Sequence, residues 1–256
     1  MRRVGAIAGL CALFIAGCGG TEAGGSAEQG TLTVFAASSL KDAFTKLGAS
    51  YALEHPGWTV RFEFLGSDDL AAQIEQGAPA DVFAAASPTY PERLQENDLL
   101  GDTTDFATNT LVLVVPPGNP ANVASPQDLT NGAKLVIGDP SVPIGSYTET
   151  VLGNLGIDAS ALNVVSREQK VTDIVTKVQL GEAEAGFVYT SDMTAAGDAL
   201  QGIDLPPAAQ ATVTYPTGIV TGSKNAEAAQ QWIDLVTGTE GQKVLTDDGF
   251  GPAPSS

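Results

Sequence analysis

The chain is poor in the residues from which most catalytic and metal-binding sites are built. Its 256 residues include one histidine, His55, and two cysteines, Cys11 and Cys18. A serine–histidine–acid triad would have to use His55, which stands in the turn-forming sequence Glu-His-Pro-Gly. A zinc site built from several histidines or cysteines lacks its ligands for the same reason. We therefore expect His55 to lie at a surface turn, and we expect neither histidine-dependent nor metal-dependent catalysis.

Positive charge and aromatic side chains are also scarce. Lysine and arginine number 12 against 30 aspartates and glutamates, which gives a formal net charge of −18. Such an acidic chain repels nucleic acid and anionic lipid, and it gives an anionic ligand no long-range attraction. Any anion must therefore be held by short-range hydrogen-bond donors. The two tryptophans, Trp58 and Trp232, lie in or beside apolar patterns and are expected in the core, so aromatic walls for a sugar site are missing.

The beginning of the chain has the features of a bacterial export signal. Arg2 and Arg3 precede an apolar stretch at 4–16, which is too short to cross a bilayer. The sequence Ile-Ala-Gly-Cys that ends at Cys18 resembles the lipobox of bacterial lipoproteins. That resemblance implies a signal peptide at 1–17 and a lipid-modified Cys18 as the first mature residue, although an ordinary cleavage site before a cysteine is the alternative.

The segment after this cysteine predicts a tether. Residues 18–30 are rich in glycine, serine and glutamate, a composition typical of flexible linkers. Cys11 would leave with the signal, so Cys18 would have no partner for an intrachain disulfide. We expect a folded body from residue 31 onward, held outside the cytoplasm and anchored to the cell membrane by lipid.

Apolar runs and helical patterns alternate along this body. We expect strands at 32–37, 59–64, 81–86, 111–115, 135–137, 163–165, 186–189 and 212–220. We expect helices at 40–51, 70–74, 90–96, 149–155, 171–180, 226–236 and 242–247. This alternation predicts an α/β protein with mainly parallel sheets. The sequence has no glycine-rich phosphate fingerprint of the dinucleotide-binding or P-loop kind.

Four loops carry small or hydroxyl-bearing residues where a strand is expected to end. They read AASS at 36–39, GSDD at 66–69, GDPSVPIGS at 138–146 and GFVYTSD at 186–192. Three of them open a helix, and the start of a helix offers unpaired N–H groups and the positive end of a dipole. Because α/β sheets bind ligands at the carboxyl ends of their strands, these loops predict a cage of donors suited to an anion.

These loops resemble those of the molybdate-binding proteins of ABC importers. The resembling stretches read TVFAASSL at 33–40, LAAQIEQGAPADVF at 70–83, GDPSVPIGSY at 138–147 and GFVYTSD at 186–192. The resemblance implies a type II periplasmic-binding-protein fold, with two α/β lobes joined by a hinge. Lobe 1 would comprise 31–113 with 216–256, and lobe 2 would comprise 114–215. It also implies a monomer without catalytic activity or cofactor that delivers molybdate or tungstate to an ABC permease.

The same resemblance implies five ligand-binding residues. Ser39 and Ser67 would use hydroxyl and backbone N–H, Ile144 and Val171 backbone N–H, and Tyr189 its hydroxyl. From the residues alone, alternatives remain open: the two serines could be helix N-caps, and Tyr189 a packed strand residue.

The sequence departs from the family at two positions near this site. Asp68 stands where a small neutral residue is more common, and Lys170 stands where an acid is more common. If both side chains face the cleft, their charges offset one another, whereas Asp68 alone would weaken the binding of an anion.

Three other functions compete with molybdate binding. The same fold could bind another tetrahedral oxyanion such as sulfate, or ferric iron through Tyr147 and Tyr189. A secreted glycoside hydrolase would need a pair of carboxylates. The candidate acid pairs are Asp68 with Asp69, Glu182 with Glu184, and Asp247 with Asp248.

Overall fold

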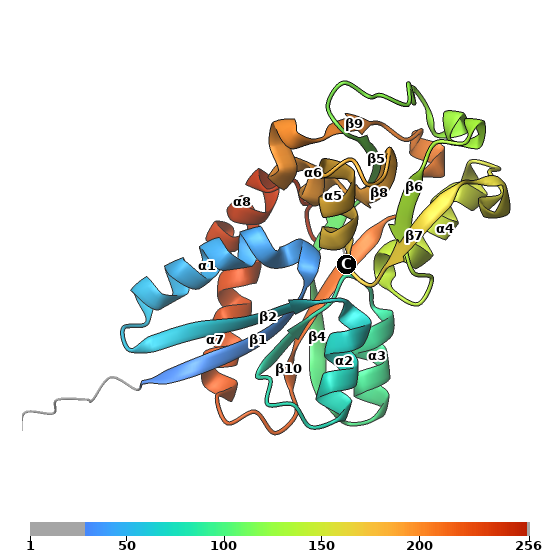
Figure 1. The fold of residues 1–256 in the computed structure, drawn as a ribbon. Coiled ribbons are helices and arrows are strands. Elements are labelled where there is room, and N and C mark those ends of the chain that lie inside the picture. Colours follow the sequence, from blue (N-terminus) through green and yellow to red (C-terminus); the bar gives the residue numbers. More distant parts are fainter. Residues whose placement is uncertain (1–28, 255–256) are drawn as a thin grey trace, which may run out of the picture.

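The computed structural model describes residues 29–254, so the expected signal peptide and Cys18 lie outside the described residues. Two five-stranded sheets form separate α/β lobes (Figure 1). The first sheet has the order β2 (Trp58–Leu65), β1 (Gly30–Ala37), β3 (Val82–Ala84), β10 (Val213–Val220) and β4 (Leu100–Asn109). The second has the order β7 (Val164–Glu168), β6 (Leu135–Gly138), β8 (Ala185–Tyr189), β5 (Leu111–Val115) and β9 (Gln201–Ile203).

Both sheets are mixed, so the expectation of mainly parallel sheets is wrong. In the first, β1 runs parallel to β2 and β3, whereas β10 runs antiparallel to β3 and β4. In the second, β6 runs parallel to β7 and β8, whereas β5 runs antiparallel to β8 and β9. Parallel neighbours need a crossover connection, usually a helix. No crossover helix precedes β5, because the chain enters the second sheet directly from β4 through Thr110.

The chain passes between the sheets twice. One passage lies between β4 and β5, and the other lies between β9 and β10. The expected lobe bounds, 31–113 with 216–256 and 114–215, stay a prediction. No helix within 29–254 has the length and apolar character that a membrane span requires.

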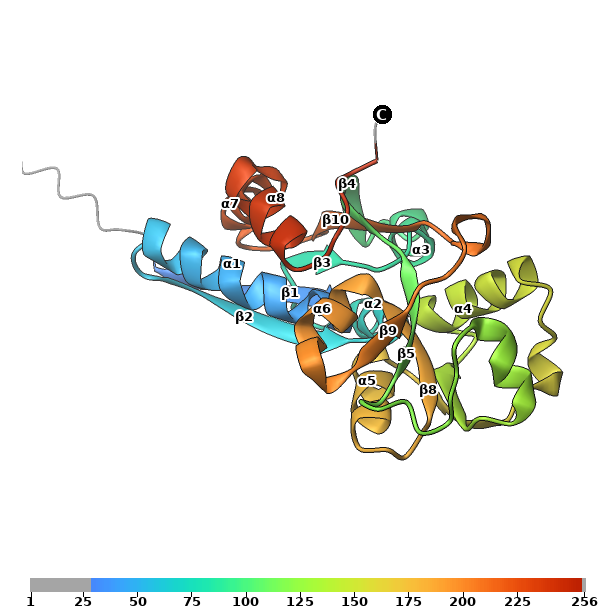
Figure 2. The ribbon, with the colours of Figure 1, turned by 90° about the horizontal axis from the view of Figure 1, so that it is seen from above.

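Helices cover the faces of both sheets (Figure 2). In the first lobe they are α1 (Lys41–Glu54), α2 (Ser67–Glu75), α3 (Thr89–Glu96), α7 (Ala226–Thr237) and α8 (Thr239–Asp247). In the second they are α4 (Pro143–Asn154), α5 (Val171–Gln179) and α6 (Thr190–Ala196). The helix α4 begins earlier than the expected 149–155, because Pro143 at its first position suits a helix start.

The core of the first lobe is divided by β1. Leu32 belongs to a cluster with Phe44 of α1 and Trp232 of α7, whose rings meet edge to face with centroids 5.3 Å apart. Phe35 points the other way and joins the cluster formed by α2 and α3. Successive side chains of a strand point to opposite faces, so β1 is buried on both sides. Trp232 is in the core as expected, and Trp58 packs against the edge of the same cluster.

Candidate functional site

A small pocket lies between the two lobes, at the carboxyl ends of strands from both sheets. It encloses about 240 Å³ of empty space, its mouth included. Its lining contains all five residues named from the sequence, namely Ser39, Ser67, Ile144, Val171 and Tyr189. The two serines follow β1 and β2, Ile144 and Val171 lie at the starts of the helices that follow β6 and β7, and Tyr189 ends β8. The structure thus brings the five positions together, while their contact with a ligand stays a prediction.

Three helices begin at this pocket without a side-chain cap. The N-cap residues of α2, α4 and α5 are Gly66, Val142 and Lys170, and none accepts a hydrogen bond from its own helix through a side chain. The first N–H groups of a helix have no acceptor within it. Those of Ser67, Ile144 and Val171 are therefore available to an anion, and the helix dipoles favour negative charge at the same place.

Two glycines place the start of α4 against the end of β6. A Cβ on Gly145 would lie 1.8 Å from the carbonyl oxygen of Asp139, and a Cβ on Gly138 would lie 2.5 Å from the nitrogen of Gly145. Atoms cannot approach so closely, so only glycine allows this packing. The contact fixes where the neighbouring Ile144 presents its backbone N–H.

Both serine hydroxyls are engaged by neighbouring groups of the first lobe. The hydroxyl oxygen of Ser67 accepts a hydrogen bond from the backbone N–H of Ala86 at 3.1 Å. The hydroxyl of Ser39 lies 3.1 Å from the hydroxyl of Tyr215 on β10. Neither serine caps its helix, so the N-cap interpretation is wrong. Tyr215 has no local sequence pattern that marks it, because its role depends on a contact with a residue far away in the chain.

Tyr189 is the most informative residue of the pocket. Its side chain is 2% exposed, and its hydroxyl has no hydrogen-bond partner among the described residues. Burial raises the pKa of Tyr189 well above its ordinary value, and the nearby Tyr215 adds to that rise. The hydroxyl is therefore protonated and has a hydrogen to donate. A buried unpartnered hydroxyl costs about 1–3 kcal/mol, so an acceptor in the pocket would relieve that cost.

The charged side chains of Lys170 and Asp68, which depart from the family pattern, do not face each other across the pocket. Lys170 lines the pocket, but its ammonium lies 3.7 Å from the carboxylate of Asp173. Asp68 is not part of the lining, and its Oδ1 is buried without a hydrogen-bond partner beside Gly66. Burial raises the pKa of Asp68, and the charge of Asp69 acts in the same direction. Of the two side chains, only Lys170 thus lines the pocket, so the condition under which their charges would offset one another there is not met.

The two lobes touch each other at and near the pocket. The hydroxyl of Tyr90 on α3 donates to the carbonyl oxygen of Ser141, which lies just before α4. At Gly66, the N-cap residue of α2, an added Cβ would lie 2.6 Å from the carbonyl oxygen of Gln169 in the other lobe. These contacts describe a closed arrangement of the two lobes.

A family model described as bacterial extracellular solute-binding protein matches residues 32–251. The chain belongs to this family. This solute-binding protein is 38% identical to the molybdate-binding protein ModA of Mycobacterium tuberculosis over 261 residues, which are 98% of this chain and 99% of that one. The resemblance to molybdate-binding proteins noted in the sequence is thereby confirmed.

Solved structures confirm the two-lobed α/β fold. The periplasmic molybdate-binding protein of Azotobacter vinelandii matches with a TM-score of 0.76 and 22% identity, covering 88% of this chain and 100% of that one. The sulfate-binding protein SubI of Mycobacterium tuberculosis matches with a TM-score of 0.75 and 17% identity, covering 87% and 86%. At these identities the likeness shows the fold alone, and proteins named for different oxyanions share it.

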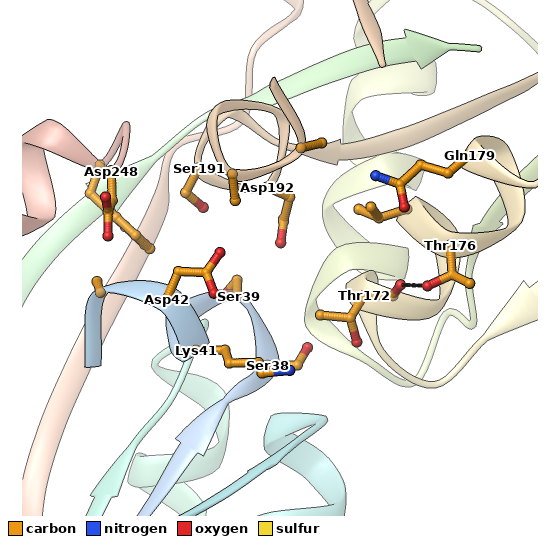
Figure 3. Close-up of a pocket in the computed structure, with 15 residues that line it drawn as sticks. Ser38, Ser39, Lys41, Asp42, Thr172, Thr176, Gln179, Ser191, Asp192 and Asp248 are labelled. Carbon is orange, nitrogen blue, oxygen red and sulfur yellow. Dashed lines mark hydrogen bonds between the residues drawn. The ribbon is translucent and has the colours of Figure 1, made fainter. Parts of the chain in front are cut away.

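The solute-binding protein has a second pocket beside the first, which shares Ser38 and Ser39 with it. Figure 3 shows carboxylates from α1 and α6, those of Asp42 and Asp192, pointing into the same space. Burial raises the pKa of Asp192 to about 7, although its carboxylate accepts the N–H of Tyr189 at 3.2 Å. No carboxylate lines the first pocket within 29–254, so the acidic groups are kept on the far side of the serines.

The other candidate residues of the solute-binding protein lie outside the pocket. The ring of His55 stacks on Tyr51 with centroids 4.3 Å apart, at the end of α1. The three acid pairs lie on different parts of the fold from one another. Several of their carboxylates bind groups close to them in the structure. Glu184 accepts the backbone N–H of Lys134 at 2.8 Å. Asp247 pairs with Lys243 one helical turn away.

Proposed function

We propose that this chain is an extracytoplasmic receptor that binds molybdate, and also tungstate, in the pocket between its lobes. It delivers the ion to the membrane permease of an ABC importer and catalyses no reaction. Full-length similarity to ModA proteins supports the ligand. The observation that carries the proposal is the buried, unpartnered hydroxyl of Tyr189 in a pocket where three uncapped helices begin.

The chemistry of the lining suits a fully deprotonated tetrahedral oxyanion. Such an ion offers only acceptors, whereas the serines, the helix starts and Tyr189 offer donors. Within the described part of the chain, the lining has no carboxylate that would repel a dianion. A protonated anion such as hydrogen phosphate would place its own O–H against donors, a mismatch that costs about 1–3 kcal/mol.

Sulfate is the nearest alternative, since it has the same charge and shape as molybdate. It is smaller, so rejection of sulfate must rest on the size of the closed pocket rather than on donor chemistry. Ferric iron is disfavoured by the tyrosines. Burial raises the pKa of both Tyr147 and Tyr189, which opposes the phenolate form that binds iron.

We further propose that the protein is anchored through lipid on Cys18 and works as a monomer. The support for the anchor is the lipobox-like sequence before this cysteine. A Cys18→Ser variant expressed in a bacterial host should shift from the membrane fraction to the soluble fraction. Retention of the variant in the membrane fraction would contradict lipid anchoring.

Calorimetric titration of the purified protein with molybdate, tungstate, sulfate and phosphate tests the proposed ligand. We expect strong binding of the first two ions only. Ser39→Ala and Ser67→Ala should each weaken molybdate binding by about 1–3 kcal/mol, because each removes a hydrogen bond to a charged ligand. Absence of molybdate and tungstate binding, or tighter binding of sulfate, would refute the proposal.

A further inference from the structure

Tyr215 lies directly behind Ser39 and outside the pocket lining. Its hydroxyl is 3.1 Å from the Ser39 hydroxyl, and its side chain has no exposed surface. Its ring meets the rings of Tyr189 and Phe250 edge to face, with centroids 6.3 and 5.3 Å away. The ring is thus held by its neighbours, and its hydroxyl is fixed at the back of the pocket.

The direction of the bond between the two hydroxyls follows from the groups around Tyr215. Burial raises the pKa of Tyr215 far above its ordinary value, so its hydroxyl keeps its hydrogen. Among the described residues, Ser39 is the one hydrogen-bond partner of this hydroxyl. The nearby Asn109 is engaged elsewhere, since its amide donates to the Ser191 hydroxyl at 2.9 Å and its oxygen accepts the backbone N–H of Thr110 at 2.9 Å. If Ser39 were the donor, the buried Tyr215 hydrogen would lack an acceptor, which costs about 1–3 kcal/mol, whereas the Ser39 hydrogen can point into the pocket. The hydroxyl hydrogen of Tyr215 therefore has the Ser39 oxygen as its acceptor.

We propose that Tyr215 is a positioning residue, which donates to the Ser39 oxygen and so directs the Ser39 hydroxyl hydrogen into the pocket. The inference rests on the proposed function and assigns the rejection of protonated oxyanions to a residue that does not touch the ligand. Ser67 is held in the same manner, because the Ala86 N–H donates to its oxygen. Both serines are thereby kept as donors toward the pocket.

Loss of the Tyr215 hydroxyl would change what Ser39 can do. Without a donor behind it, the Ser39 hydroxyl is free to rotate and to accept a hydrogen bond from a ligand. An acceptor-only ion then loses a preoriented donor, whereas hydrogen phosphate or hydrogen arsenate gains an acceptor for its own O–H. The ratio of the two affinities, rather than either affinity alone, reports this positioning role.

The test compares Tyr215→Phe with the wild type by titration with molybdate and by competition with hydrogen phosphate near neutral pH. Molybdate affinity should fall about three- to tenfold, the range of one neutral hydrogen bond, while phosphate affinity stays equal or rises. In a Ser39→Ala background, Tyr215→Phe should have no further effect on molybdate. Equal loss for both anions, or a further loss in the Ser39→Ala background, would overturn the inference.

The matched control is Tyr51→Phe. Tyr51 is equally buried and its hydroxyl donates to the carbonyl oxygen of Ala228 at 3.2 Å, away from the pocket. This variant should change neither affinity. If the wild type binds no molybdate or tungstate, both the proposed function and this inference fail. If the wild type binds but Tyr215→Phe leaves the affinity ratio unchanged, only the inference fails.

A measurement on the wild type tests the same inference even if the Tyr215→Phe variant fails to fold. In NMR spectra of the wild type, the Tyr215 hydroxyl proton should exchange slowly and show a cross-peak to Ser39. A Tyr215 hydroxyl proton with cross-peaks to Asn109 alone would overturn the assigned direction.

Discussion

Removal of the Tyr189 hydroxyl should have opposite effects on binding and on stability. Among residues 29–254 this buried hydroxyl has no hydrogen-bond partner, so Tyr189→Phe removes a polar group that is costly to bury. With an oxyanion bound, the same hydroxyl donates to a charged acceptor, a bond worth about 1.5–3 kcal/mol. We therefore expect molybdate affinity to fall about 10- to 100-fold, while the ligand-free protein unfolds at an equal or higher temperature.

Calorimetry for affinity and thermal unfolding without ligand would measure these two effects. Tyr51→Phe provides the reverse pattern, because its hydroxyl has a protein acceptor and lies away from the pocket. That control should lose stability, by about 1 kcal/mol, and keep its affinity. If Tyr189→Phe bound molybdate as tightly as the wild type, or lost stability as the control does, the assignment of Tyr189 as a ligand donor would be refuted.

Three further substitutions test closure and burial. Gly66→Ala should weaken molybdate binding at least tenfold by calorimetry, since its Cβ would lie 2.6 Å from the Gln169 carbonyl across the cleft; Gly153→Ala, with open space around it, should not. Tyr90→Phe removes the bond between the lobes and should lower affinity by about 0.5–1.5 kcal/mol. In the wild type, the unfolding free energy measured by urea unfolding should fall by about 1.4 kcal/mol per pH unit between pH about 4 and about 7. The Asp192→Asn variant should not show this fall.

The sign of the last prediction follows from where the proton is held. The folded pKa of Asp192 is about 7, above its ordinary value of 3.8, because the carboxyl is buried. Between these values the folded protein keeps the proton and the unfolded chain releases it, so a rise in pH favours unfolding. If the unfolding free energy changed with pH at the same slope in the wild type and in Asp192→Asn, the raised pKa of Asp192 would be contradicted.

Much of the fold was predictable from periodicity, because most strands and helices have clear apolar patterns. The strand β4 was not foreseen. Its sequence LGDTTDFATN is largely polar, since β4 forms an edge of the sheet and much of it is exposed. The mixed direction of the sheets was also missed, because strand direction depends on the two passages between lobes and has no local signal.

The candidate site could be predicted only in part from residues alone. The clustering of small residues at strand ends indicated an anion site, whereas the choice of Ile144 and Val171 came from the family resemblance, since a backbone donor leaves no mark in the side chain. Tyr215 and the Tyr90 contact with Ser141 were missed. Both depend on residues that are distant in the chain and adjacent in space.

The pocket lining formed by the described residues holds no carboxylate, although the protein has a net charge of −18, and this contrast has a kinetic consequence. An incoming dianion diffuses against the field of the whole molecule, and dissolved salt screens that field within about 10 Å at 0.1 M. Once inside, the ion is held by dipoles at contact distance, which salt hardly affects. Added salt should thus accelerate capture while leaving the residence time of the ion almost unchanged, the reverse of what a receptor with a basic cleft would show.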